Sequence, residues 1–132
     1  GGGSGTSGVA RKAGGPAGIA DYYLEVKSSG VSGQSGSKLT VFTSTNHDFE
    51  GNYVAIGAKA IKMDINNFGP DTVNMRMNFA EQHPAGNNTV DDRITTNAVT
   101  LLPGSGWTTV TFSLLDADMT VIPGSSCSGA AC

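Results

Sequence analysis

The stretch Thr72-Val73-Asn74-Met75-Arg76-Met77-Asn78-Phe79 decides the fold class of this chain, because apolar and polar residues alternate strictly along it. A period of two residues is typical of a β-strand with one buried face and one solvated face. Residues 60–66 alternate in the same way, and residues 67–71 between the two runs have the composition of a turn. We therefore predict two neighbouring antiparallel strands joined by that turn.

Further short strands are predicted on both sides of this pair. They are expected over residues 22–28, 38–44, 94–101 with a break near Asn97, and 107–114, followed by a turn of helix or a short edge strand over 116–121. Trp107 is expected to cover the core at the start of its strand, and Val110 and Phe112 of the same strand are expected to point inward. In the strand over 22–28, Tyr22, Leu24 and Val26 are expected to share one face. Six or seven short strands without a long amphipathic helix favour an all-β fold, an antiparallel β-sandwich of jelly-roll type.

The composition predicts one β domain with a terminal segment at each end. Residues 1–20 are rich in glycine and offer little to bury, so we expect a flexible N-terminal arm whose adhesive residues are Val9, Arg11 and Lys12. Residues 21–122 then form the β-sandwich, and residues 123–132 form a C-terminal tail. Because Cys127 and Cys132 lie close together in this tail, we favour a disulfide between them, with intermolecular bonds and free thiols as alternatives.

The net charge, the lengths of the apolar runs and the composition exclude several classes of partner. The eight basic residues among 132 form no basic stripe and the net charge is −3, so nucleic acid is not an expected partner. No apolar run has the length of about 20 residues that a membrane span needs. The 19 glycines and the many Ser, Thr and Asn residues suit a secreted β-protein. The sequence starts without an initiator Met or a signal peptide, so we expect a processed form or a fragment.

Residues that bear chemistry are sparse, and no enzyme is predicted from them. There is no nucleophile elbow, phosphate-binding loop or reactive CxxC motif. Ionisable groups gather in four short segments, which we interpret mainly as solvated turns: 47–50, 81–83, 91–92 and 116–118. The acidic pairs Asp91-Asp92 and Asp116-Ala117-Asp118 have the oxygen ligands that a structural calcium would use, although turn and capping chemistry explains them equally well. No catalytic residue, cofactor or resident metal is therefore assigned.

A sugar-binding surface is a second interpretation of the same strands. Exposed aromatic rings pack on sugar C–H groups, while amides and guanidinium groups bond to hydroxyls. The candidates are Tyr53 from a loop and Asn74, Arg76 and Asn78 from the solvated face of the alternating strand. Core packing is the alternative for the aromatic residue.

Three segments carry a resemblance to a known group of domains. They are Gly14-Gly15-Pro16-Ala17-Gly18 leading into residues 21–26, Phe49-Glu50-Gly51-Asn52-Tyr53 leading into 54–69, and Leu102-Pro103-Gly104-Ser105-Gly106-Trp107 leading into 108–114. Over most of residues 14–122 the chain resembles secreted bacterial jelly-roll domains similar to galactose-binding-like and carbohydrate-binding modules. Such domains begin with an additional strand, carrying an aromatic and an acidic residue, ahead of the Gly/Pro stretch, and this resemblance implies that the strand is missing or replaced here. An open sheet edge would then invite another chain.

Two functions follow from these observations. The first is an extracellular, non-enzymatic structural protein that assembles with copies of itself, as a filament or surface matrix, through the N-terminal arm or an open sheet edge. Low charge favours this hypothesis because it weakens repulsion between subunits. The second is a carbohydrate-binding module for extracellular polysaccharide.

Overall fold

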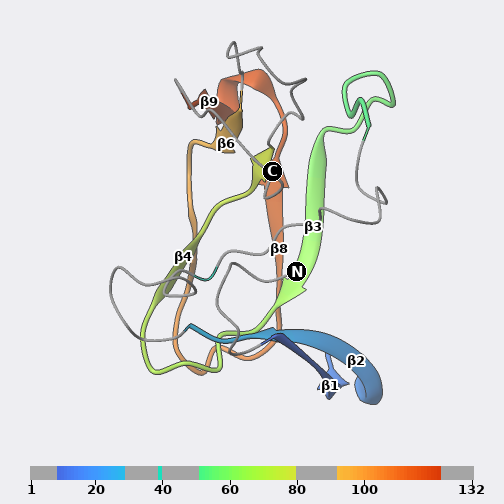
Figure 1. Cartoon of the computed structure of the whole chain (residues 1–132), viewed down its shortest axis with the longest axis vertical. Coiled ribbons are helices and arrows are strands. Elements are labelled where there is room, and N and C mark those ends of the chain that lie inside the picture. The colour runs from blue at the N-terminus through green and yellow to red at the C-terminus, as the bar shows by residue number, and fades with distance from the viewer. Residues whose placement is uncertain (1–8, 29–38, 40–50, 80–91, 123–132) are drawn as a thin grey trace. The chain divides into compact units, whose positions relative to one another are not determined.

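A computed structural model describes residues 9–28, 39, 51–79 and 92–122 of the chain (Figure 1). These residues form antiparallel β-sheets and one short 3-10 turn, so the predicted all-β class is confirmed. The chain divides into two compact units, residues 1–50 and residues 51–132. This division differs from the predicted boundary after residue 20.

The first unit contains a two-stranded hairpin in place of a flexible arm. Strand β1 (Val9–Gly15) pairs antiparallel with β2 (Gly18–Val26) through a tight turn at Pro16 and Ala17. The glycines that suggested flexibility have a specific role here, because Gly14 and Gly18 adopt φ values of 92° and 115° that other residues rarely tolerate. Residues 9–20 are thus ordered, and the prediction of a flexible arm over them was wrong.

A strand also precedes the turn at Pro16 and Ala17. This strand is β1, whose sequence VARKAGG has neither an aromatic nor an acidic residue. The predicted strand over 22–28 is confirmed in part, since β2 begins four residues earlier at Gly18. The predicted strand over 38–44 lies outside the described residues except for Leu39.

The second unit is built on a ladder between β3 (Ala60–Ile65) and β8 (Thr108–Ser113). Exposed and partly buried residues alternate along β3, as its sequence predicted. In β8 the predicted inward residues Val110 and Phe112 are both buried. They lie opposite Met63 and Ile61 of β3, so the apolar sides of the two strands coincide.

The two alternating runs do not pair with each other, which corrects the predicted hairpin. Strand β4 (Val73–Met75) pairs with β7 (Val99–Leu101), while β3 pairs with β8 (Figure 1). Residues of both ladders pack on one buried cluster of Leu101, Val110 and Phe112, with surrounding side chains from Met63, Ile65, Val73, Met75, Met77 and Val99. The turn over residues 67–71 therefore connects the β3–β8 ladder to the β4–β7 ladder, because the apolar faces of both ladders pack on the same core.

A bulge interrupts the predicted long strands at their middle. Beyond β4 the pairing resumes between β5 (Asn78–Phe79) and β6 (Arg93–Thr95), and β6 also pairs with β9 (Met119–Val121). Between the pairs Met75–Val99 and Asn78–Ile94, residues 76–77 on one side lie opposite residues 95–98 on the other, so the second segment has two extra residues. The break predicted near Asn97 is confirmed.

Thr95 closes this bulge from a buried position. The Thr95 amide donates to the Met77 carbonyl oxygen at 2.9 Å, and the Met77 amide donates to Thr95 Oγ1 at 3.1 Å. Arg76 Nη1 donates to the Thr95 carbonyl oxygen at 3.2 Å. The ladder bonds lost at the bulge are thus replaced by a threonine side chain and an arginine.

The last predicted segment forms both of its alternatives in succession, a 3-10 turn η1 (Asp116–Asp118) followed by β9. The described strands make separate two-stranded and three-stranded sheets. The β-sandwich therefore stays a prediction, while the antiparallel β class stands.

Candidate functional site

The hairpin β1–β2 presents a largely apolar face. Residues directly opposite in an antiparallel pair share a face, and every second pair returns to it. The pairs Val9–Val26, Arg11–Leu24 and Ala13–Tyr22 therefore project to the same side. The alternate pairs Ala10–Glu25 and Lys12–Tyr23 project to the other side. We call the first set, Val9, Arg11, Ala13, Tyr22, Leu24 and Val26, the hairpin face.

Three large side chains of the hairpin face are substantially exposed. The exposed fractions are 44% for Val9, 56% for Tyr22 and 55% for Leu24. The prediction that Tyr22, Leu24 and Val26 share one face is confirmed, but the sequence gave no sign that Tyr22 and Leu24 are more than half exposed. Alternation reports which residues share a side and does not report whether another layer packs there.

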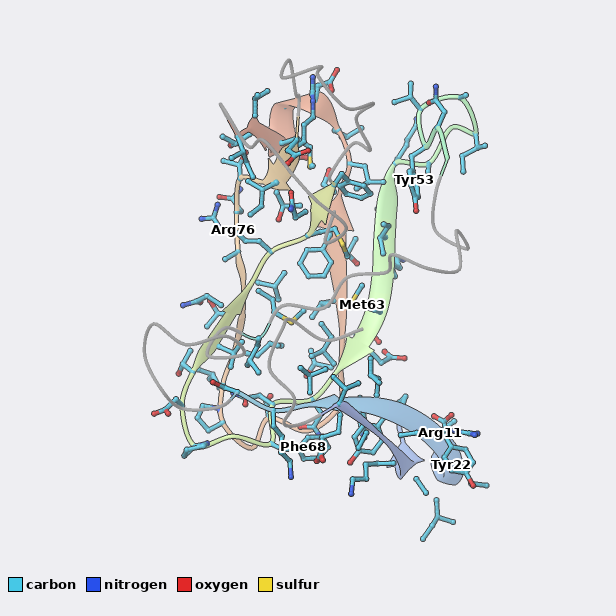
Figure 2. All side chains as sticks on the ribbon, in the orientation of Figure 1. Arg11, Tyr22, Tyr53, Met63, Phe68 and Arg76 are labelled. Atoms are coloured by element: carbon cyan, nitrogen blue, oxygen red, sulfur yellow. The ribbon has the colours of Figure 1, made fainter. Side chains whose placement is uncertain are left out.

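Arg11 lies over the ring of Tyr22, with its guanidinium carbon 3.9 Å from the ring centroid (Figure 2). Such a cation–π contact is worth about 0.5–1 kcal/mol at an exposed site. Of the three residues predicted to be adhesive, Val9 and Arg11 belong to the hairpin face, whereas Lys12 belongs to the opposite side.

The turn of the hairpin is fixed by Asp21. Its Oδ2 accepts a hydrogen bond from the Ala17 amide at 3.1 Å, and its Oδ1 accepts one from the Tyr22 amide at 2.9 Å. A Cβ atom on Gly15 would lie 2.4 Å from Asp21 Oδ2. The absence of a side chain at Gly15 therefore lets the Asp21 carboxylate approach and accept the amide of Ala17 in the turn.

The four predicted sugar contacts are not brought together. Asn74, Arg76 and Asn78 are exposed on the solvated side of β4 and β5, as predicted. The ring of Tyr53 (Figure 2) instead packs edge-to-face on the ring of Phe79, with centroids 5.3 Å apart. Phe79 follows Asn78 directly in β5, so the two side chains lie on opposite sides of the strand. Asn74 Oδ1 accepts a bond from Thr100 Oγ1 at 2.8 Å, and Arg76 is bonded to Thr95, so two of the polar groups already serve the fold.

The acidic pair of η1 has structural partners. Asp116 Oδ1 lies 2.8 Å from Arg93 Nη1, and the Asp118 carboxylate accepts a hydrogen bond from the Ser113 hydroxyl. Within the described ranges no group of three or more His, Cys, Asp or Glu residues is placed to hold a metal ion. Asp92 is buried, and its carbonyl oxygen accepts the Ile122 amide at 2.8 Å. An ion pair with Arg93 and a hydrogen bond from Ser113 thus account for Asp116 and Asp118.

Several predicted features lie outside the described residues, namely the Cys127–Cys132 pair, Asp91, and the histidine segments 47–50 and 81–83. In the part of the chain that the structure describes, no helix is long and apolar enough to span a bilayer.

Sequence reasoning missed one surface feature. Phe68 was assigned to a turn and Trp107 to the core, but Phe68 is 59% exposed and its ring meets that of Trp107 edge-to-face, with centroids 5.9 Å apart. A phenylalanine inside a Gly/Pro turn is the signal that could have identified it, because turns lie at the surface.

Comparison with known proteins adds no relative to this description. A scan of protein-family models and searches of curated proteins and of solved structures gave no match. The candidate surface therefore has to be interpreted from its own chemistry.

Proposed function

We propose that this protein is a non-enzymatic, extracellular structural subunit whose copies assemble through the hairpin face. The single observation that supports the proposal most strongly is the exposure of Val9, Tyr22 and Leu24 on one side of a two-stranded hairpin. An isolated two-stranded hairpin is marginally stable in water, and a third strand or a packed apolar layer is what stabilises it. A second hairpin face from a neighbouring copy provides such a layer.

The expected strength of the contact follows from the exposed area. Burying the remaining half of a Val, Leu or Tyr side chain contributes about 1 kcal/mol. Two hairpin faces in contact then gain roughly 6 kcal/mol, which is near the lower end of the 4–15 kcal/mol cost of association. One such contact gives weak, concentration-dependent pairing, and stable polymers need several contacts in parallel.

The charge of the chain is compatible with assembly. The net charge is −3 over 132 residues, so repulsion between copies is small. Arg11 is the one charged residue of the hairpin face, and its position over Tyr22 lets the guanidinium stack at an interface.

The test compares two glutamine variants of the hairpin. Leu24→Gln changes the hairpin face, whereas Lys12→Gln changes an exposed residue on the other side of the same two strands. Sedimentation velocity over a wide concentration range, with negative-stain electron microscopy of the same samples, should show assembly for the wild type and for Lys12→Gln and its loss for Leu24→Gln. A wild type that stays monomeric at the highest concentration would refute the proposal, as would equal assembly by both variants.

A further inference from the structure

Three of the four methionines of the chain line the core of the second unit. Met63 (Figure 2), Met75 and Met77 are each partly exposed and pack against the buried cluster around Phe112. We call these three residues the core methionines. The fourth methionine, Met119, lies in β9 and does not belong to this cluster as the described residues form it.

The core methionines come from both ladders and from the bulge that follows β4. Met63 in β3 lies directly opposite the buried Val110 of β8, and Met75 lies in β4 of the other ladder. Met77 makes the backbone hydrogen bonds of the bulge with Thr95. A change of size or polarity at the three sulfur atoms therefore acts on the core that the two ladders share.

The side chains around the core methionines are apolar. The other members of the cluster are leucine, valine, isoleucine and phenylalanine, whose side chains neither donate nor accept hydrogen bonds. The thioether of methionine fits such surroundings, whereas methionine sulfoxide carries a polar S–O group. A polar group held away from water without a hydrogen-bond partner destabilises the fold that contains it.

The core methionines are also accessible to a dissolved oxidant. Each has part of its surface in solvent, and methionine oxidation follows exposure. The core is small, because three apolar residues are buried within the described ranges and the core methionines are three of the six side chains that surround them. Oxidation of this set therefore changes half of the layer that covers the core.

We propose that the core methionines are an oxidation site through which a peroxide destabilises the second unit. One oxygen atom passes from hydrogen peroxide to each thioether sulfur, so a sulfur–oxygen bond forms as the oxygen–oxygen bond breaks. The other peroxide oxygen leaves as water with both protons, and the sulfur loses the two electrons that the peroxide gains. Methionine sulfoxide reductases, with a thiol as reductant, reverse this step. The site is independent of assembly through the hairpin face.

Urea unfolding of the full chain before and after treatment with hydrogen peroxide tests the proposal. The single tryptophan, Trp107, lies in the second unit, so its fluorescence follows the unfolding of this unit. Mass spectrometry of peptides should find one added oxygen at each core methionine. The urea midpoint should then fall by about 1 M or more. Treatment with the two reductases, one for each sulfoxide epimer, should restore it.

Leucine variants assign the effect to particular sulfur atoms. A triple variant with Met63→Leu, Met75→Leu and Met77→Leu keeps the apolar volume and removes the sulfur atoms, so peroxide should leave its midpoint unchanged. Met119→Leu is the matched control, and its midpoint should fall as far as that of the wild type. Both cysteines and Trp107 are present in every variant, so their oxidation does not distinguish the variants.

Several results would overturn the proposal. One is an unchanged wild-type midpoint while the core methionines carry oxygen, and another is oxidation of Met119 that spares them. An equal fall of the midpoint in the triple variant would assign the effect to other residues. If the triple variant does not fold, Met63→Leu and Met75→Leu are tested singly. Each should lose less than the wild type on oxidation, and full losses in both would overturn the proposal too.

Discussion

Asn67 should contribute more to stability than any exposed asparagine of the described strands, and Asn67→Ala measures this. The substitution removes three side-chain hydrogen bonds at once, those to Asp71, Leu101 and Gly69. The Leu101 bond is buried, so its carbonyl oxygen is left without its partner, at a cost of about 1–3 kcal/mol. The other two are partly buried and are worth roughly 0.5–1 kcal/mol each because water replaces part of them. The sum is a loss of about 3 kcal/mol.

Urea unfolding followed by circular dichroism is the assay, with Asn74→Ala as control. Asn74 is exposed and accepts one bond from Thr100, so its removal should cost about 0.5 kcal/mol or less. The urea dependence should be unchanged for both variants, which keeps the comparison one of stability. A loss below about 1 kcal/mol for Asn67→Ala would mean that the backbone alone holds the turn, and it would contradict this account of Asn67.

Two further predictions concern the bulge and the hairpin turn. Thr95→Val keeps the side-chain shape but removes the acceptor for the Met77 amide, so we expect the free energy of unfolding in urea to fall by about 1–3 kcal/mol. The control is Thr111→Val on the exposed side of β8, which should lower it by about 0.5 kcal/mol or less. Equal losses in the two variants would contradict the role of the Thr95 hydroxyl. Gly15→Ala places a Cβ atom against the Asp21 carboxylate and should speed hydrogen exchange at the Ala17 amide. In a protein that already carries Asp21→Ala, the same Gly15→Ala substitution should change the exchange rate little. An equal increase in both backgrounds would show that the clash is elsewhere.

Much of the secondary structure was predictable because it depends on local pattern. The alternation over 60–66 and 72–79 predicted β3, β4 and β5, and inward Val110 and Phe112 predicted the buried side of β8. The break near Asn97 was also visible, because polar residues there interrupt the apolar run. Strand β1 was not predicted, because a glycine-rich composition favours flexibility, whereas Gly14 and Gly18 here supply the φ angles of a turn.

The sequence by itself determined the class of this protein, because a period of two residues fixes strands and their sides without reference to any partner. Only the tertiary structure decided which strands pair. Asp64 and Thr109, 45 residues apart, share a hydrogen bond across β3 and β8, although the alternating run nearest β3 in the sequence is β4. Pairing is set by which apolar faces reach the common core around Phe112, and that depends on the whole chain. Exposure is decided in the same way, and so the hairpin face became a candidate for function only in the folded molecule.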